Sequence, residues 1–377
     1  MQRIIRNRRA RGYLIQAVVL AASLLLTLSF ILTARDNLVS QGIATGFGFL
    51  ERSTGWPINF SIVEVTDRSP YSRMLLAGFL NTIIVGLAGL AGATCVGLIV
   101  GLMRVSSNLI LNVLGTVFVE TFRNVPLILQ VIFWYAIFTH LPSPRGAIDL
   151  AGFGFLSNRG LMIATPSWSS WDLLILVVAI IATIVAARRF GGDRLLTKWG
   201  IGVAVVVALA TALLFFGHDP DTPLISRPEL KGLRFVGGAT IKPEFSALLI
   251  AIMVFGGAYI GEIVRGGFLS VDKGRLEAAR ALGLSTTQIN RFIRVPLAIR
   301  AMLPALTNQY VWLMKATTLG IAIGYPDYFM VVSTSINQSG QTMELLLLLM
   351  VGFLIINYTI SGSMNWINSR LAIKGRS

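Results

Sequence analysis

Residues 277–296 read EAARALGLSTTQINRFIRVP, a polar stretch with three arginines in a chain that is otherwise strongly apolar. Good helix formers fill its first six positions, and Gly283 supplies the left-handed conformation that closes a helix. Ser285 and Gln288 have the spacing of a capping box, so a second helix is expected to start there and to be limited by Pro296. The stretch therefore predicts two short helices joined by a sharp turn.

The composition around this stretch indicates an integral membrane protein. Hydrophobic residues make up 54% of the 377 positions and charged residues only 13%, which is too apolar for a soluble fold. The net charge of +15 would suit a nucleic-acid partner. The arginines, however, lie in short loops between apolar runs, as the positive-inside rule predicts. We therefore expect membrane lipid around the chain and no nucleic acid.

The apolar runs predict an all-α polytopic membrane helix bundle of about eight transmembrane helices, each near 20 residues long. The runs cover about residues 13–33, 74–103, 111–138, 173–187, 199–216, 245–264, 301–324 and 345–367. The first run is long enough to span and has no evident cleavage site, so a removed signal peptide is disfavoured. An even number of crossings, with arginines at alternate ends, predicts that both termini are cytoplasmic.

The chain divides into four predicted segments. They are residues 1–73, an N-terminal tail with the first transmembrane helix and an external loop; 74–139, the first part of a core; 140–244, inserted external loops with two extra transmembrane helices; and 245–377, the second part of the core, with a cytoplasmic loop at 270–300. Pro126 lies within the third apolar run, so we expect a kink there.

The second run carries a ridge of small residues. Gly89, Ala93, Gly97 and Gly101 recur at intervals of four and therefore share one helix face. Such a ridge lets another helix approach closely, which makes helix packing a better interpretation than a ligand site.

Motifs of catalysis and nucleotide binding are missing from the sequence. No G-x-x-x-x-G-K-[ST] loop is present, so the chain is not expected to bind ATP itself. Nucleophile elbows and H-E-x-x-H pairs are also missing. His140, His218 and Cys95 are isolated from one another, so we expect no metal site and no disulfide within the chain.

Several ionisable residues lie within the apolar runs, where each costs about 2.5–3.5 kcal/mol on insertion scales. Glu120 with Arg123, and Glu262 with Arg265, are three residues apart and could pair along their own helices. Lys315 lies roughly 21 Å along its helix from the start of its run, too deep for its ammonium group to reach the cytoplasmic surface easily. It must therefore line a polar cavity or form a buried salt bridge.

A pathway for a small polar solute needs hydrogen-bond donors and acceptors at this depth. The polar residues that could provide them are Arg123, Asn124, Asn308, Lys315 and Thr318. We interpret these five as a candidate substrate pathway.

The opening stretch also resembles a known motif. Glu277-Ala278-Ala279, then Gly283, Ile293 and Pro296, reproduce the pattern E-A-A-x3-G-x9-I-x-L-P of the EAA loop of bacterial ABC importer permeases, with Val295 in place of the usual Leu. Further stretches resemble the subfamily that imports histidine, glutamine and other polar amino acids. They are YIGEIVRGGF at 259–268, ETFRNVPL at 120–127 and KATTL at 315–319.

The resemblance covers about residues 74–138 and 245–367 and implies a type I ABC importer permease core of five helices. The enlarged form, with its inserted segment, resembles the broad-specificity L-amino-acid importers, in which two non-identical permeases pair. In such a transporter a periplasmic substrate-binding protein delivers an amino acid, and two ABC ATPase subunits bind ATP and Mg. This chain would hold no cofactor and would lie in the bacterial inner membrane.

The resemblance also assigns roles within the EAA loop, whose helix would seat in a groove of the ATPase. The coupling residues that it implies are Glu277, Ala278, Ala279, Gly283, Leu284 and Ser285.

Three alternatives remain open at this point. A permease of the same type could carry another small polar solute, such as an opine or a compatible solute. An ion-coupled secondary transporter would use the membrane carboxylates for protons or sodium, but inverted repeats are not evident in the sequence. A membrane-embedded enzyme would need a catalytic constellation at one interface, and none is visible.

Overall fold

The computed structural model describes residues 8–40, 46–167, 223–232 and 234–371, together with scattered helical positions between 172 and 212. The chain forms two compact units. The first unit comprises Met1–Arg123 and Ile252–Ser377, and the second comprises Asn124–Ala251. Each is described by itself below.

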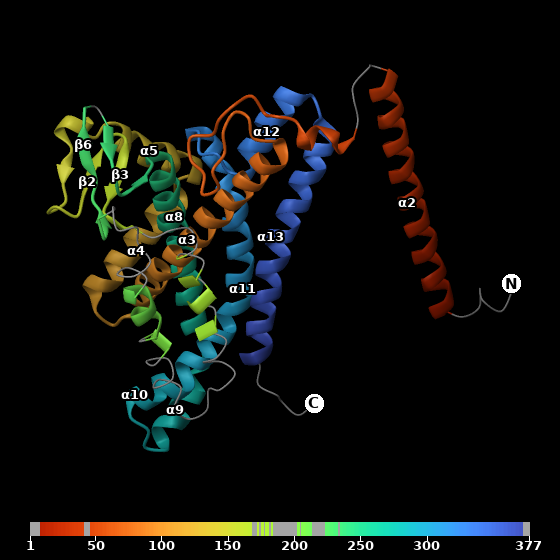
Figure 1. The fold of residues 1–377 in the computed structure, drawn as a ribbon. Coiled ribbons are helices and arrows are strands. Elements are labelled where there is room, and N and C mark those ends of the chain that lie inside the picture. Colours follow the sequence, from red (N-terminus) through yellow and green to blue (C-terminus); the bar gives the residue numbers. More distant parts are fainter. Residues whose placement is uncertain are drawn as a thin grey trace. The chain divides into compact units, whose positions relative to one another are not determined.

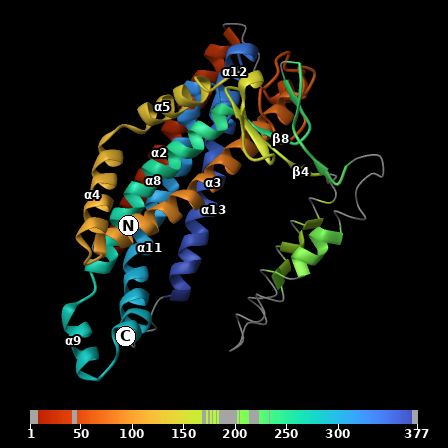
Figure 2. The same ribbon diagram turned by 90° about the vertical axis from the view of Figure 1, so that its left-hand side faces the viewer.

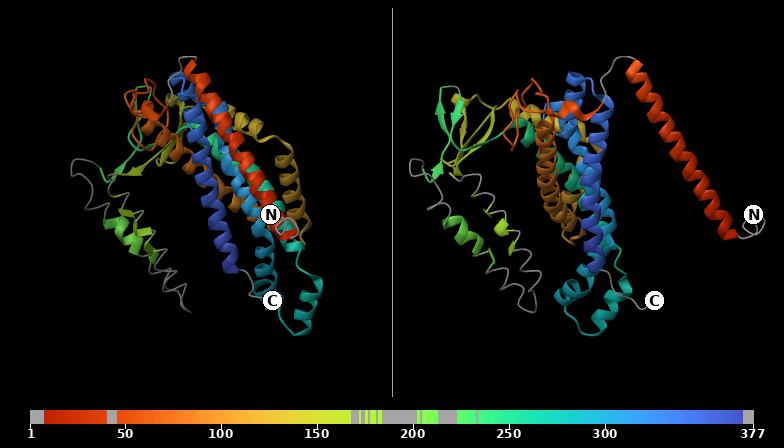
Figure 3. Two further views of the ribbon diagram at one scale, coloured as in Figure 1. Left: turned by 90° about the vertical axis from the view of Figure 1, so that its right-hand side faces the viewer. Right: turned by 45° about the vertical axis from the view of Figure 1, so that its right-hand side comes forward.

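Long helices dominate the first unit (Figures 1 and 2). They are α2 (Arg8–Ser40), α3 (Tyr71–Val105), α4 (Leu109–Asn124), the greater part of α8 (Pro243–Leu269), α11 (Val295–Ala316), α12 (Tyr328–Ser339) and α13 (Thr342–Leu371). α11 packs along α13, and the two helices lie side by side in the blue part of Figure 3. The predicted helical membrane bundle is therefore confirmed.

Four of the described helices are long and apolar enough to cross a membrane. They contain Arg11–Thr33, Tyr71–Val105, Pro243–Leu269 and Thr342–Arg370, and the pair α4 with α5 (Leu127–Thr139) makes a fifth, broken span. α11 is helical where a span is predicted, but Asn308, Gln309 and Lys315 make it more polar than these. Most of the pair predicted at 173–187 and 199–216 lies outside the described residues.

The third predicted span departs from expectation at its proline. Instead of one kinked helix over 111–138, the chain ends α4 at Asn124 and starts α5 at Leu127. Pro126 is the N-cap residue of α5, with a non-helical ψ of 136°. Because proline has no N–H and disfavours a helical residue before it, the break falls where the sequence places Val125-Pro126.

The small-residue ridge of α3 packs on α8. A Cβ atom added at Gly89, Gly97 or Gly101 would overlap Ile252, Ile260 or Val264, respectively. Ala93, between them, is fully buried. The contacts advance in the same direction along both helices, so α3 and α8 run parallel. We call this contact the glycine seam. It lets the two backbones approach more closely than any larger side chain would allow.

A buried polar cluster ties the start of α12 to α3. The side-chain amide of Asn81 donates to the carbonyls of Phe60 and Pro326, both at 2.9 Å. The hydroxyl of Tyr325 donates to the carbonyl of Asn81 at 3.0 Å, and the N–H of Tyr328 donates to Thr82 Oγ1 at 2.8 Å. Because Asn81 and Thr82 are fully buried, these bonds replace hydration that the backbone groups have lost.

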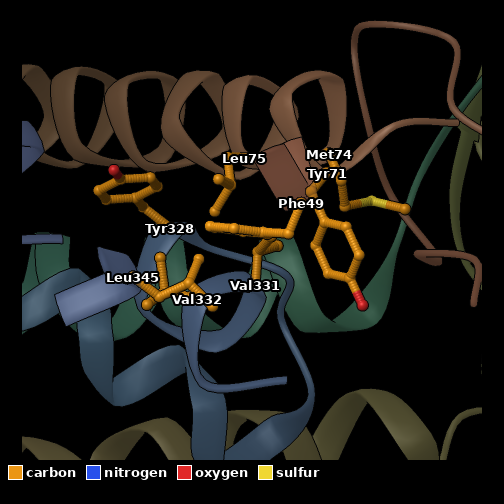
Figure 4. Packing of buried hydrophobic residues seen from close by; sticks show 8 residues of the cluster. All are labelled: Phe49, Tyr71, Met74, Leu75, Tyr328, Val331, Val332 and Leu345. Carbon is orange, nitrogen blue, oxygen red and sulfur yellow. The ribbon is translucent and has the colours of Figure 1, made fainter. Parts of the chain in front are cut away.

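Apolar side chains complete the contact between α3 and α12. Figure 4 shows those of α3 facing those of α12. Phe49, from the short 3-10 helix η1 (Phe47–Glu51), joins them and is 3% exposed. The segment before α3, predicted as an external loop, is thus partly folded against the helices. The cluster consists of Phe49, Tyr71, Met74, Leu75, Tyr328, Val331, Val332 and Leu345.

The second unit contains short strands where the sequence predicted only external loops. The short 3-10 helix η2 (Pro144–Gly146) precedes them. A four-stranded antiparallel sheet has the order β1-β2-β3-β8, from strands β1 (Ile148–Asp149), β2 (Gly154–Ser157), β3 (Gly160–Ile163) and β8 (Ala239–Ile241). Two smaller sheets pair β4 (Thr165–Pro166) with β5 (Ile225–Ser226), and β6 (Glu229–Lys231) with β7 (Arg234–Val236). Strands of two to four residues give too little alternation to be recognised in sequence.

The glycine seam predicts a sharp cost for one added methyl group. In a Gly101→Ala variant, the new Cβ would lie 2.5 Å from Val264 Cβ and 2.8 Å from the carbonyl oxygen of Gly261. Backbone must move to relieve this overlap, so we expect the free energy of unfolding to fall by about 1–3 kcal/mol.

Unfolding by heat or denaturant in detergent measures this cost. The matched control is Gly362→Ala in α13, where the added Cβ meets nothing within 4 Å among the described residues. It should be neutral or stabilise by up to about 1 kcal/mol. Equal stability of the two variants would contradict the packing described.

Candidate functional site

The opening stretch forms a helical hairpin. α9 (Lys273–Ala281) begins at Asp272, whose carboxylate accepts from the N–H of Gly274 at 2.9 Å. The helix closes at Gly283, which has φ 76° and whose N–H donates to the carbonyl of Arg280 at 2.9 Å. A side chain at this position would be strained by that conformation, so glycine is required for the sharp turn.

The second arm begins with the predicted capping box. Ser285 Oγ accepts from the N–H of Gln288, and Gln288 Oε1 accepts from the N–H of Ser285, at the start of α10 (Thr286–Ile289). Both reciprocal bonds are present, so the predicted helix start at Ser285 is confirmed.

The predicted end of this arm at Pro296 is wrong. The helical path continues from α10 through a π-helical turn, η3 (Asn290–Arg294), directly into α11. Pro296 lies in the first turn of α11, and the widened turn precedes it. A π-helical turn relieves the clash that a proline ring makes with the preceding helical turn. As a result, the hairpin is joined to α11 without a loop.

The turn of the hairpin and the π-helical turn that follows it both expose apolar surface. Leu282 is 81% exposed and Phe292 is 65% exposed, whereas Ala279 is buried in the fold of the hairpin itself. Glu277 and Ala278 are exposed on α9, and Leu284 is half-buried. Figures 1 and 2 show α9 and α10 beyond the end of α11. Large apolar side chains exposed on a polar, capped hairpin are typical of a surface that contacts a partner.

An ion-pair network lies at one end of the glycine seam. Arg104, in the last turn of α3, contacts the carboxylate of Glu262 on α8. Glu262 also pairs with Arg265 at 2.6 Å, as the spacing of these two residues predicted. Glu120 on α4 lies 3.9 Å from Arg104. We call Arg104, Glu120, Glu262 and Arg265 the seam network.

Sequence reasoning did not single out Arg104, because its partner is 158 residues away. The sequence feature that could have identified Arg104 is its position, three residues beyond the last glycine of the ridge. Its side chain is only 10% exposed, and a charge so buried must be paired. The network thus joins α3, α4 and α8 around one buried guanidinium group.

The five candidate pathway residues lie in different surroundings. The guanidinium of Arg123, in the last turn of α4, lies 5.1 Å from the ring centroid of Tyr259 on α8, a cation–π contact. Asn124 ends α4 and belongs to the second unit. The remaining three lie on α11 and on η4 (Thr317–Ile323), the 3-10 helix that continues it.

α11 presents a polar face that its own unit leaves uncovered. Asn308 and Lys315 are exposed and, seven residues apart, share that face with Trp312, which is 42% exposed and stacks on Phe255. Thr318 Oγ1 donates to the carbonyl of Lys315 at 2.8 Å. Of the five residues, the structure therefore brings Asn308, Lys315 and Thr318 onto one face.

The described residues of this chain form a multi-pass helix bundle from which a capped helical hairpin projects. The sequence profile described as "Binding-protein-dependent transport system inner membrane component" matches residues 93–373. The chain belongs to this family of transport-system membrane subunits.

Two curated relatives extend the match over almost the whole chain. The "General L-amino acid transport system permease protein AapQ" of Rhizobium johnstonii is 36% identical over 353 residues, which cover 90% of this chain and 87% of that protein. The "Putative amino-acid ABC transporter permease protein YhdX" of Escherichia coli is 34% identical over 381 residues, covering 98% and 96%. A crystal structure of "an amino acid ABC transporter with histidines" aligns with a TM-score of 0.47 and 18% identity, over 80% of this chain and 95% of that one.

The seam network predicts that its central carboxylate is essential to the fold. In Glu262→Gln, the nearly buried guanidinium of Arg104 loses its closest negative partner. We expect the free energy of unfolding to fall by about 1–3 kcal/mol, between the cost of breaking an exposed pair and a buried one. The measurement is unfolding of the purified chain in detergent.

The matched control is Glu120→Gln, because that side chain is 58% exposed and lies 3.9 Å from Arg104. It should change stability by less than about 1 kcal/mol. The double variant Arg104→Met, Glu262→Met removes both charges and should recover part of the loss. Equal stability of the two glutamine variants would refute the role of Glu262.

Proposed function

We propose that this chain is a permease subunit of an ATP-driven importer for L-amino acids, with a broad substrate range. It pairs with a second, non-identical permease, receives its solute from a periplasmic substrate-binding protein, and is driven by two ABC ATPase subunits that bind ATP and Mg. The amino-acid substrate is supported by two relatives, at 36% and 34% identity, whose names specify amino-acid transport.

The observation that carries the mechanism is the exposed hairpin of α9 and α10. It is capped at both helix starts, closed by Gly283, and presents Leu282 to the outside. On this proposal the hairpin lies in the cytoplasm and seats in a groove of an ATPase subunit, with both chain termini on the same side. The many arginines near it support this orientation.

The hairpin has the connections that a lever needs. α8 reaches α9 across only Ser270, Val271 and Asp272, and the second arm runs without a loop into α11. A displacement of the hairpin would therefore be passed to two helices. One of them carries the glycine seam, and the other carries the polar face of Asn308 and Lys315. In this account the polar face lines the pathway at the contact with the second permease.

Uptake by the reconstituted transporter tests the function directly. Vesicles containing this chain with its permease partner, ATPase and binding protein should accumulate L-amino acids only when ATP is supplied. Uptake of another polar solute in place of amino acids would retain the importer and refute the substrate. Gradient-driven uptake by this chain alone would instead favour an ion-coupled transporter.

Gly283 provides a sharper test of the lever. A Gly283→Val variant places a β-branched side chain at φ 76°, a conformation strained for such residues. We expect ATP hydrolysis to continue while amino-acid uptake falls at least tenfold, with the bundle still folded. The control is Gly283→Asn, because asparagine tolerates left-handed backbone. It should retain most uptake, and unimpaired uptake by the valine variant would exclude the lever role.

The pathway assignment predicts altered transport from alanine variants of Arg123, Asn124, Asn308, Lys315 and Thr318. Lys315→Ala should change the relative uptake of acidic, neutral and basic amino acids, because it removes an exposed charge from the polar face. The control is Arg370→Ala, a cation near the end of α13 that lies over Trp366. Unchanged substrate preference in all five alanine variants would rule the pathway out.

A further inference from the structure

A cavity of about 590 Å³ lies in the second unit, and none of the residues assigned above to the pathway lines it. Its walls come from the end of α5, the turn between β2 and β3, strands β7 and β8, and the first turn of α8. The volume falls within the range of small-molecule sites, about 300–1,000 Å³. The cavity is thus large enough for a solute of amino-acid size.

Positive charge dominates the lining. Arg159, Arg234 and Lys242 face the cavity together with a single carboxylate, that of Glu244. Among the described residues, none of these four groups has an ion-pair partner within 4.0 Å. The single carboxylate of Glu244 offsets only one of the three cations, so the lining keeps a net positive charge that attracts an anion. The arrangement therefore favours a ligand that carries carboxylate groups.

The same cavity also holds hydrogen-bond acceptors without donors. Glu244 Oε2 and Asn158 Oδ1 are buried, and within the described part of the chain they have no hydrogen-bond partner. A buried acceptor without a donor is costly, and such atoms are rare in folded proteins. An ammonium group offers three donors, so it could bond to either oxygen once a side-chain rotation turns that oxygen toward the cavity.

The walls of the cavity are held in place by packing. Phe235, which lines it, stacks on Phe155 of β2 with ring centroids 4.8 Å apart, and this contact fixes the β6–β7 hairpin against the larger sheet. β8 pairs with β3 and leads directly into Lys242 and α8. Arg234 is therefore carried by a paired strand and Glu244 by a helix start, while Arg159 lies in the tight turn between β2 and β3 and Lys242 directly follows β8.

From this combination we infer that the cavity binds an acidic amino acid. Its two carboxylates pair with Arg159, Arg234 and Lys242, and its ammonium group is held by Glu244 and Asn158. The inference does not rest on the proposed transport function. It assigns the second unit a solute site of its own, so that an acidic amino acid would bind in this unit as well as in any pathway through the bundle.

Calorimetric titration of the purified full-length chain in detergent with L-glutamate tests this inference. We expect saturable binding that weakens at least tenfold in the double variant Arg159→Gln, Arg234→Gln. The matched control is Lys231→Gln. Lys231 is the register partner of Arg234 across β6 and β7, is exposed, and does not line the cavity. Its variant should bind glutamate as the parent chain does.

Comparison ligands separate the parts of the site. Glutarate is glutamate without its ammonium group, so it should bind more weakly than glutamate, and Glu244→Gln should remove that difference. Glutamine, with one carboxylate fewer, should also bind more weakly. Inorganic phosphate that binds as tightly as glutamate would mean a general anion site and would overturn the proposal.

Two further results would also overturn it. One is the absence of saturable glutamate binding, and the other is undiminished binding in a folded Arg159→Gln, Arg234→Gln variant. The Lys315→Ala chain should still bind glutamate, which separates this site from the pathway. Because the titration needs neither ATP nor partners, failure of transport would leave its result standing.

Discussion

The close contact between α3 and α8 is the constraint on which the rest of the first unit depends. Three glycines and one alanine remove the side chains that would hold the helices apart, and the side chains of Ile252, Ile260 and Val264 fill the space. Without a hydrophobic driving force between helices in lipid, such packing is the main source of association. The seam network then fixes the end of this contact through charge, because Arg104 is too buried to remain unpaired.

The hairpin is joined on one side to α8, which makes the close contact with α3, and on the other side to α11. A linker of three residues follows α8, and a continuous helical path leads into α11. A displacement of the hairpin would therefore reach the packed helices, with little loop to absorb it. The exposed Leu282 gives the partner that we propose a surface to contact.

Sequence reasoning succeeded where local rules decide the structure. The capping box at Ser285, the turn at Gly283 and the pairing of Glu262 with Arg265 each depend on residues a few positions apart. It failed where contacts between segments far apart in the sequence decide the structure. Arg104, for example, meets Glu262 across two helices. Two failures are local: the strands of the second unit are too short to show a period, and Pro296 is accommodated by a π-helical turn instead of ending the helix. The cations and acceptors of the second unit come together only when strands from 154–163 and 234–241 pair.

The central claim is that the hairpin transmits force from an ATPase. Site-specific photocrosslinking tests it most directly, with a photoreactive amino acid in place of Leu282 in the complete transporter in its native membrane. The account predicts a crosslink to a P-loop-containing subunit whose yield changes when ATP binds. Substitution of Leu346, an exposed residue of α13, should give no such product. Crosslinking of the Leu282 position to lipid alone, in a transporter that still imports amino acids, would contradict the account.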